Sequence, residues 1–322
     1  MEEFVKKEAP SRPPRGEERG MKNEKMKNRI LIDAHSHLWL KQDTKVDGKV
    51  IRSLKNGRSI FMDEEVQMLP PFMIDSVNSA EVFLSNMNYA QVGAAVVVQE
   101  VIDGNQNAYL KEVQQRYPDR FFCMAMAFTL DEAKQAFADG FRGIAIPGHR
   151  VKESLFGMME QFKFMESKGM ILSMCLGDDE RQIAEMAEVI EECPQLKVAI
   201  GHFGMPTTPS FESQVRLALH GENVMIESGG ITWLYNSEFY PFPSAIRSIR
   251  RAAELVGMDR LMWGSDYPRT ITAITYRMSY DFVSKSSELT EEEKSLFLGQ
   301  NAQRFYGFQN LPDLPYIKNM SE

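Results

Sequence analysis

Two histidines stand one residue apart in the stretch LIDAHSHLWL, although the chain of 322 residues contains only five histidines. They are His35 and His37. Side chains alternate in direction along extended backbone, so a His-x-His pair on a strand directs both imidazoles to the same side. Two neutral imidazoles that face one point form part of a site for a divalent metal ion. Completing such a site requires further ligands from other parts of the chain.

Other polar side chains stand directly after short apolar runs, or at their last position. If these runs are parallel strands of one closed barrel, the residues at their ends converge on a common pocket. The side chains concerned are Glu100, His149, Arg150, Cys175, His202, Glu227 and Asp266. Together with the histidine pair they form the candidate site.

The elements that must position these residues are short apolar runs that alternate with longer amphipathic stretches. This pattern predicts parallel strands joined by helices. The expected strands cover residues 30–33, 94–99, 121–126, 143–146, 171–174, 197–200, 224–227 and 260–263. Eight strands are the number in a (β/α)8 TIM barrel, so the expected fold class is α/β, with a distorted barrel of this kind.

The connection between residues 37 and 78 is long for a compact domain. It contains KQDTKVDGKV and MLPPF, and we expect a long loop after strand one. If the first strand ends at Asp33, this loop leaves the face of the barrel that carries active sites, and it is a candidate lid or substrate wall. The alternative is a family-specific insertion without a catalytic role.

Composition along the chain indicates the domain organisation. Residues 1–28 are rich in Lys, Arg, Glu and Pro and lack the apolar core of a signal peptide, so we expect a disordered N-terminal arm. No long linker interrupts the rest, so residues 29–322 are expected to form a single domain. Hydrophobic residues at 43% and charged residues at 25% match a soluble globular protein with an ample core.

Charge and cysteine content exclude several classes of partner. A formal net charge of -8 and a pI near 5.4 leave no broad cationic surface for nucleic acid. No apolar run approaches the ~18 residues that span a bilayer, so a membrane is not an expected partner either. The three cysteines argue against a disulfide framework and favour a reducing cytoplasm. The expected partner is a small-molecule substrate, and the sequence is compatible with a homo-oligomer.

Four motifs carry a family resemblance: IDAHSHLW, VAIGHFG, MWGSDYP and GQNAQRFYG. In order and spacing they resemble the amidohydrolase superfamily, specifically its amidohydrolase-2 branch of lactone hydrolases and metal-assisted decarboxylases. The resemblance extends over residues 30–308. Together the motifs are specific for the superfamily and do not select a substrate.

The resemblance implies roles for individual residues. His35 and His37 match the pair that binds the metal in metal-dependent members. Asp266 matches the aspartate that ligates the metal or activates the hydrolytic water. His202 matches the histidine that contacts a second metal, the substrate or its leaving group. The family commonly has a metal-ligating histidine where this chain has Cys175.

Two interpretations of Cys175 stay open. A thiolate is a good zinc ligand, so a divalent ion, zinc or manganese, could be held by His35, His37, Cys175 and Asp266. Alternatively the ligand is lost, the enzyme works without metal, and Cys175 is a small buried hydrophobic residue.

The resemblance implies a hydrolase that opens a small carboxylated or sugar-acid lactone by water attack. With a metal, the ion would lower the pKa of bound water toward ~7 and Asp266 would take the proton. Without one, Asp266 would be the general base, and His35, His37 and His202 would stabilise the oxyanion. The alternatives are a metal-dependent non-oxidative decarboxylase of the same branch and an inactive barrel that acts as a binding protein.

Four further residues are candidates for substrate contact. His149 and Arg150 could bind a substrate carboxylate through charge-assisted hydrogen bonds, or they could be ordinary loop residues. Glu227 stands deep enough to meet a sugar hydroxyl or a catalytic water. Glu100 is also a candidate, although carboxylates at strand ends often cap loops or helices.

Overall fold

Parallel strands form the centre of the computed structural model, which describes residues 29–316 and 318–320. A small sheet has the order β1-β6-β7, with β1 (Ile32–Ser36), β6 (Ala94–Val97) and β7 (Phe121–Cys123). A larger sheet has the order β13-β12-β11-β10-β9-β8. Its strands are β8 (Ala125–Met126), β9 (Gly143–Ile146), β10 (Ile171–Met174), β11 (Lys197–Ile200), β12 (Val224–Glu227) and β13 (Leu261–Met262). The arm predicted over residues 1–28 lies outside the described residues.

The parallel strands lie where the apolar runs predict them, because strands buried on both faces need nearly continuous apolar sequence. Some boundaries differ. Met124 separates β7 from β8 within the third predicted run, and β13 is shorter than predicted. β1 begins and ends later than predicted, so His35 lies within the strand and His37 directly follows it.

Backbone hydrogen bonds hold the residues after β13 alongside β1. The amide of Ala34 donates to the carbonyl of Trp263 over 2.8 Å, and the amide of Asp266 donates to the carbonyl of His35 over 2.9 Å. Because these hydrogen bonds are made by the main chain, they hold the backbone of Asp266 beside the histidine pair independently of any side-chain contact.

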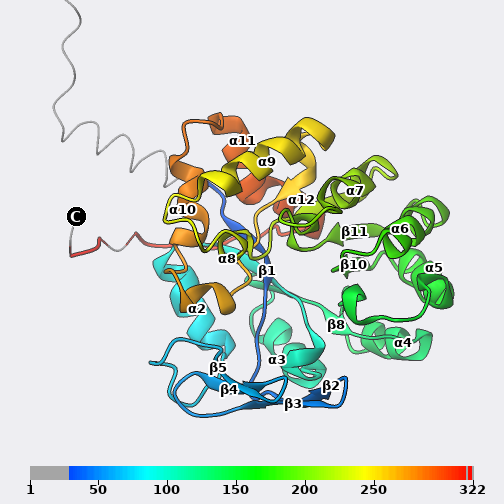
Figure 1. Cartoon of the computed structure of the whole chain (residues 1–322), viewed down its shortest axis with the longest axis horizontal. Coiled ribbons are helices and arrows are strands. Elements are labelled where there is room, and N and C mark those ends of the chain that lie inside the picture. The colour runs from blue at the N-terminus through cyan, green and yellow to red at the C-terminus, as the bar shows by residue number, and fades with distance from the viewer. Residues whose placement is uncertain (1–28, 317, 321–322) are drawn as a thin grey trace, which may run out of the picture.

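Helices cover the outside of the parallel strands (Figure 1). Their bounds are α2 (Ala80–Tyr89), α3 (Asn107–Arg116), α4 (Leu130–Ala138), α5 (Met159–Ser167), α6 (Glu180–Glu192), α7 (Phe211–Arg216), α8 (Ile231–Leu234), α9 (Pro243–Val256), α10 (Met278–Lys285), α11 (Glu291–Ser295) and α12 (Asn301–Tyr306). In α6, Ile183 and Met186 recur at helical spacing and are buried, and the Asp179 carboxylate accepts hydrogen bonds from the first turn. Within the described residues, none of the helices combines the length and apolar character that a bilayer span needs.

Short helical turns carry several of the candidate site residues. They are η1 (Val101–Asp103), η2 (Gly148–Arg150), η4 (His202–Gly204) and η7 (Arg269–Thr272). The turns η1, η2 and η4 come soon after β6, β9 and β11, so their side chains lie near the carboxyl ends of the parallel strands.

The prediction of a long loop after β1 is wrong. Residues 43–67 form a four-stranded antiparallel sheet of order β2-β3-β4-β5, drawn in blue at the lower edge of Figure 1. The strands are β2 (Asp43–Val46), β3 (Lys49–Ser53), β4 (Arg58–Phe61) and β5 (Glu64–Gln67). Asp47 and Gly48 join β2 to β3 with positive φ angles, as a two-residue hairpin turn requires. Ile51 of β3 is buried in one cluster with Ile102, which connects this sheet to η1.

Candidate active site

Three ligand atoms meet at the ends of β1 and β13. His35 Nε2 lies 3.1 Å from His37 Nε2. The Oδ1 atom of Asp266 lies 3.0 Å from His37 Nε2 and 3.7 Å from His35 Nε2. All three side chains are buried, with no more than 3% of their surface exposed. We call these three residues the Asp266 group.

Glu227, at the end of β12, lies on the side of His35 that faces away from Asp266. His35 Nδ1 donates to Glu227 Oε1 over 2.7 Å. The backbone amides of His202 and Gly229 donate to Oε1 and Oε2 over 3.1 and 2.6 Å. Burial raises the pKa of Glu227, but the charge and hydrogen bond of His35 outweigh it and leave the pKa below its ordinary value. An ionised carboxylate therefore orients the His35 ring.

His37 has an acidic neighbour of its own. Its Nδ1 lies 3.3 Å from Oδ2 of Asp103 in η1. Oδ1 of Asp103 accepts from Arg269 Nη2 over 2.8 Å and from Gln42 Nε2 over 2.9 Å. Gln42 in turn accepts through Oε1 from the hydroxyl of Ser59, in β4, over 3.0 Å. Polar side chains thus connect the antiparallel sheet to His37.

The Asp266 group fits a divalent metal ion. His35 Nδ1 donates to Glu227, and His37 Nδ1 lies 3.3 Å from Asp103, so neutral rings that carry their proton on Nδ1 direct bare Nε2 lone pairs toward each other and toward Asp266. Such lone pairs repel unless a cation or a proton lies among them. Ligands of a tetrahedral zinc ion with bonds of ~2.0–2.1 Å lie about 3.3 Å apart, close to the 3.0, 3.1 and 3.7 Å found here. Carboxylates on the second ring nitrogen are also usual around metal-binding histidines.

Asp266 is held in a demanding conformation. Its φ of 57° lies in the left-handed region, which non-glycine residues adopt at an energetic cost and often at functional sites. Its Oδ2 accepts from Trp233 Nε1 over 2.8 Å. Burial raises the pKa of Asp266, but the hydrogen bond with His37 and the charge of Arg269 hold the pKa well below the usual range. The carboxylate is therefore ionised at neutral pH.

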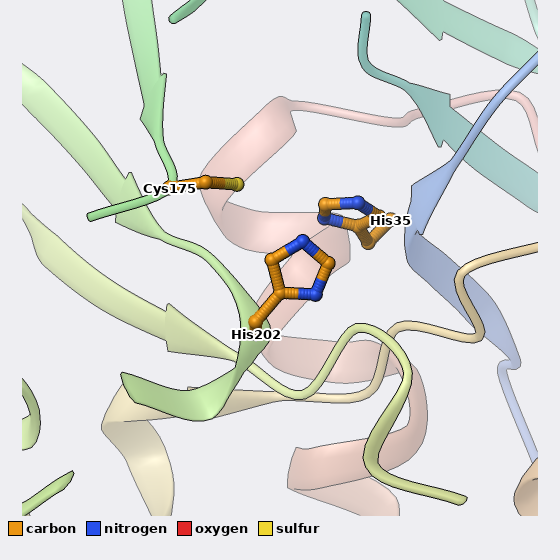
Figure 2. A group of neighbouring side chains, drawn as sticks. All are labelled: His35, Cys175 and His202. Atoms are coloured by element: carbon orange, nitrogen blue, oxygen red, sulfur yellow. The ribbon is translucent and has the colours of Figure 1, made fainter. Parts of the chain in front are cut away.

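A second group of ligand atoms shares His35. Figure 2 shows the thiol of Cys175, just after β10, and the imidazole of His202 directed toward the His35 ring. One ligand atom from each of these residues lies within 4.8 Å of the others. We call these three residues the Cys175 group. Among the described residues Cys175 joins this group and not His37 and Asp266, so the single metal set predicted from the sequence is divided in two.

Cys175 and His202, the two residues of the Cys175 group that the Asp266 group lacks, are uncharged at neutral pH. Burial and the neighbouring His35 lower the pKa of His202, and its Nδ1 donates to the carbonyl of Gly229 over 2.9 Å. A neutral His202 ring therefore keeps a bare Nε2. Burial raises the pKa of the Cys175 thiol well above its usual value.

A small open pocket adjoins both ligand groups. It is lined by His35, His37, Val98, Gln99, Glu100, Ala145, Ile146, Pro147, Ser173, Cys175 and His202. Of the four candidates for substrate contact, Glu100 lines this pocket. Arg150 pairs with Glu100, since its Nε and Nη2 each lie 3.3 Å from a carboxylate oxygen. His149 lies beside the pocket with Nδ1 3.2 Å from the Cys175 carbonyl, and Glu227 is buried behind His35.

Two charged residues of the site were not predicted from the sequence. Asp103 lies several residues beyond the end of β6, whereas the candidates predicted from the sequence stand directly after an apolar run or at its end. Arg269 follows Asp266 by three residues, and its Nη1 lies 3.6 Å from Asp266 Oδ1. This short sequence separation from a predicted catalytic residue was the available signal for Arg269, whereas Asp103 had none.

Replacing Asp103 with Asn is expected to weaken metal binding by about 10- to 100-fold, the usual effect of losing an outer carboxylate. The amide can keep a contact with Gln42, but the negative charge beside His37 and Arg269 is lost. Calorimetric titration of metal-depleted protein with Mn2+ measures the change. Asp131→Asn, at an exposed aspartate, is the matched control. An unchanged Kd for Asp103→Asn would show that this residue does not support the candidate metal site.

Three glycines leave the space in which His35 and Cys175 pack. A Cβ atom at Gly264 would lie 2.6 Å from the Cβ of His35, and one at Gly229 would lie 2.8 Å from its Cγ. A Cβ atom at Gly201 would lie 2.4 Å from the Sγ of Cys175. Real Cβ atoms do not approach other atoms this closely, so a side chain at any of these three positions would force His35, Cys175 or the backbone to shift.

Gly264→Ala is therefore expected to lower the free energy of unfolding by roughly 1–3 kcal/mol, the range for overpacking a tight core. The added methyl group must displace His35 or the backbone of β1. Gly157→Ala is the matched control, because nothing lies within 4 Å of a Cβ atom there. Urea unfolding of both variants measures the difference, and equal stabilities would contradict the packing argument.

Comparison with protein families gives one match. The family model described as Amidohydrolase matches residues 32–308. No curated protein sequence matches the chain.

Solved structures match most of the chain at low identity. A probable 2-pyrone-4,6-dicarboxylic acid hydrolase from Acinetobacter baumannii, with citric acid bound, is 21% identical with a TM-score of 0.65, over 86% of this chain and 99% of that one. An amidohydrolase from Burkholderia multivorans with bound zinc is 15% identical with a TM-score of 0.64, over 88% and 100%. A 5-carboxyvanillate decarboxylase from Novosphingobium aromaticivorans, complexed with manganese and 4-hydroxy-3-methoxy-5-nitrobenzoic acid, is 15% identical with a TM-score of 0.50, over 71% and 80%. These likenesses show a common fold.

Proposed function

The chain belongs to the amidohydrolase family, and on that premise we propose that it is a hydrolase that opens a small hydroxylated lactone. The observation that carries the proposal is the Asp266 group, in which two imidazole nitrogens and an ionised carboxylate converge beside an open pocket. This set of ligands and proton acceptors suits water attack on an ester carbonyl.

The proposal includes a single distorted (β/α)8 barrel. Its support is the main-chain bonding between the two parallel sheets. The amide of Ala34 donates to Trp263, and the amide of Met124, between β7 and β8, donates to Val97 over 2.9 Å. In such a barrel the carboxyl ends of the strands carry the active site, in agreement with the proposed chemistry.

His35, His37 and Asp266 would hold a divalent ion, zinc or manganese. When bound, such an ion lowers the pKa of water toward ~7 and polarises the substrate carbonyl. Support comes from the bare Nε2 lone pairs of this chain. The solved structures with zinc and with manganese are consistent with the same class of ion.

Asp266 and His202 divide the handling of protons. The ionised carboxylate of Asp266 accepts a hydrogen bond from the attacking water and so turns an oxygen lone pair toward the ester carbonyl. His202, neutral and with a bare Nε2, accepts the proton that the water loses and returns it to the ring oxygen as the acyl–oxygen bond breaks. One water is consumed, and the new carboxylic acid releases one proton to solvent.

The charge pairing at the site favours a neutral substrate rather than a carboxylated one. Arg150 is paired with Glu100. Arg269 is paired with Asp103 and Asp266. A substrate carboxylate would have to separate one of these ion pairs, whereas sugar hydroxyls can donate to Glu100 without doing so. We therefore expect sugar lactones to be better substrates than dicarboxylated pyrones.

A panel of lactones tests the proposal. Purified protein reconstituted with Zn2+ or Mn2+ is mixed with neutral sugar lactones and with carboxylated lactones, and acid release is followed with a pH indicator. Carbon dioxide release from hydroxybenzoates is measured in parallel. Faster acid release from the neutral lactones supports the proposal. Carbon dioxide release without acid release from any lactone would make the protein a decarboxylase. If neither the lactones nor the hydroxybenzoates are turned over, the result would favour an inactive barrel that acts as a binding protein.

The pH profile should reflect His202. Because burial and the charge of His35 lower its pKa below 6.5, the proton-accepting form persists to lower pH than in an ordinary histidine. We expect kcat/KM to fall in acid with a midpoint below pH 6.5, and a midpoint above that value would contradict this role. His202→Asn should lose this acid limb together with most of the activity.

A further inference from the structure

Cys175 has no part in the hydrolysis proposed above, although its thiol is directed at the same imidazole that serves the Asp266 group (Figure 2). We propose that His35, Cys175 and His202 form a second, sulfur-containing ligand group, and that the softness of the divalent ion decides which of the two groups binds it. This inference rests on the proposal that the site holds a divalent ion.

The two imidazoles of the Cys175 group are arranged as ligands. His35 uses Nδ1 to donate to Glu227, and His202 uses Nδ1 to donate to the carbonyl of Gly229. Each ring therefore keeps a bare Nε2 when it is neutral. The ring centroids lie 4.6 Å apart, so one ion can contact both rings.

The thiol can reach such an ion without movement of the backbone. The amide of Cys175 donates to the carbonyl of Ile146 over 3.2 Å, and its own carbonyl accepts from the amide of His149 over 2.9 Å. Gly201 leaves the space that Sγ occupies. Sulfur and nitrogen ligands of a tetrahedral zinc ion lie about 3.5 Å apart. The ligand atoms lie within 4.8 Å of one another, and rotation of the side chains would bring them to that value.

The two groups compete because both include His35, whose Nδ1 is occupied by the hydrogen bond to Glu227. His35 Nε2 has a single lone pair and binds one ion at a time. The Asp266 group offers two nitrogens and a carboxylate oxygen, which suit Mn2+, whereas the Cys175 group offers two nitrogens and a sulfur, which suit Zn2+ and Cd2+. The same pocket thus holds Mn2+ nearer Asp266 and the thiophilic ions nearer Cys175.

Spectroscopy of the metal-loaded full chain tests the inference apart from activity. Metal-depleted protein is titrated with Co2+, and a sulfur-to-cobalt charge-transfer band is sought in the near ultraviolet. The band should appear in the wild type and in Cys193→Ala, the matched control, and should be absent from Cys175→Ser. Cys175→Ser should also bind Cd2+ at least about tenfold more weakly while binding Mn2+ as the wild type does. Asp266→Asn should show the opposite pattern.

Each outcome decides the inference. A band in the wild type that disappears in Cys175→Ser supports it, whether or not lactones are hydrolysed. Absence of cobalt binding, absence of the band, or a band that persists in Cys175→Ser overturns it, even if the Mn2+ form hydrolyses lactones. If Cys175→Ser fails to fold, cadmium NMR of the wild-type protein replaces it, and a chemical shift without a sulfur contribution overturns the inference.

Discussion

Asp266→Asn is expected to lower kcat/KM for lactone hydrolysis by at least about 10²- to 10⁴-fold, the range for loss of a group that handles the water proton. The neutral amide neither helps to hold a cation between the two Nε2 atoms nor offers the ionised oxygen that orients the attacking water. Steady-state kinetics on the best lactone of the panel, with metal content measured on the same sample, give the result. A rate within a few-fold of wild type would end the role proposed for Asp266.

Asparagine is the informative replacement at this position because it preserves the fold. It tolerates the φ of 57° better than most residues do. Its carbonyl can accept from Trp233 in place of Oδ2, and its NH2 group can donate to the bare Nε2 of His37. Because the lowered pKa of Asp266 means that its ionised form stabilises the fold, we expect the metal-depleted variant to fold but to have a lower thermal midpoint than metal-depleted wild type. Asp131→Asn should change neither activity nor stability.

Glu227→Gln should produce the largest loss of stability, about 3–5 kcal/mol, because it breaks a buried charged pair. Both oxygens of Glu227 accept from N–H groups, those of His35, His202 and Gly229. Whichever way the glutamine amide is turned, its NH2 group faces an N–H donor at 3.1 Å or less. Metal affinity should also fall about 10- to 100-fold, because His35 loses its orienting carboxylate.

The stability difference should itself depend on pH. The pKa of Glu227 is lowered in the folded protein, so its carboxylate stabilises the fold above the ordinary pKa and this contribution is lost as the pH falls. Unfolding in urea at neutral and at acidic pH should therefore show a smaller gap between wild type and Glu227→Gln in acid. Glu188→Gln, at an exposed position in α6, is the control. A gap that is constant with pH would show that the charge contributes nothing.

The parallel strands were predictable because a strand that is buried on both faces consists of a continuous run of apolar residues. Continuous apolar runs placed β6 to β12 to within a few residues. The meeting of His35, His37 and Asp266 also followed from sequence, since each stands at the end of a run. That inference needed the ends of the first and last strands to be neighbours, and the main-chain bond between Asp266 and His35 makes them so.

The antiparallel sheet was not predicted, because its strands are short and largely exposed. β5 has the sequence EEVQ and no buried residue, so it lacks the alternation of apolar and polar residues that would indicate a strand. The usable signals were the turn pairs Asp47-Gly48 and Asn56-Gly57, all with positive φ. Asp103 could not be found without this sheet, since the hydrogen bond from Gln42 and the packing of Ile51 against Ile102 bring it to His37.

The division of the predicted metal ligands into two groups also lay beyond the sequence. Strand order indicates which residues reach the pocket, but not which side chains face each other within it. Cys175 and His202 follow neighbouring strands, β10 and β11, whereas His37 and Asp266 lie by β1 and β13. The Cys175 thiol and the Asp266 carboxylate therefore lie on opposite sides of His35.

The three glycines that surround His35 and Cys175 limit how this protein can be altered in the laboratory. A Cβ atom at Gly201, Gly229 or Gly264 would collide with Cys175 or His35, so substitutions at these three positions should lower the stability of the fold, and larger side chains should lower it more than alanine does. The β2-β3 hairpin and the segment after β9 have more room for substitution, and Lys152 and Asp47 join them by an exposed ion pair of 2.6 Å. Because these two surface segments touch, they would have to be randomised together, or exchanged as one unit between relatives.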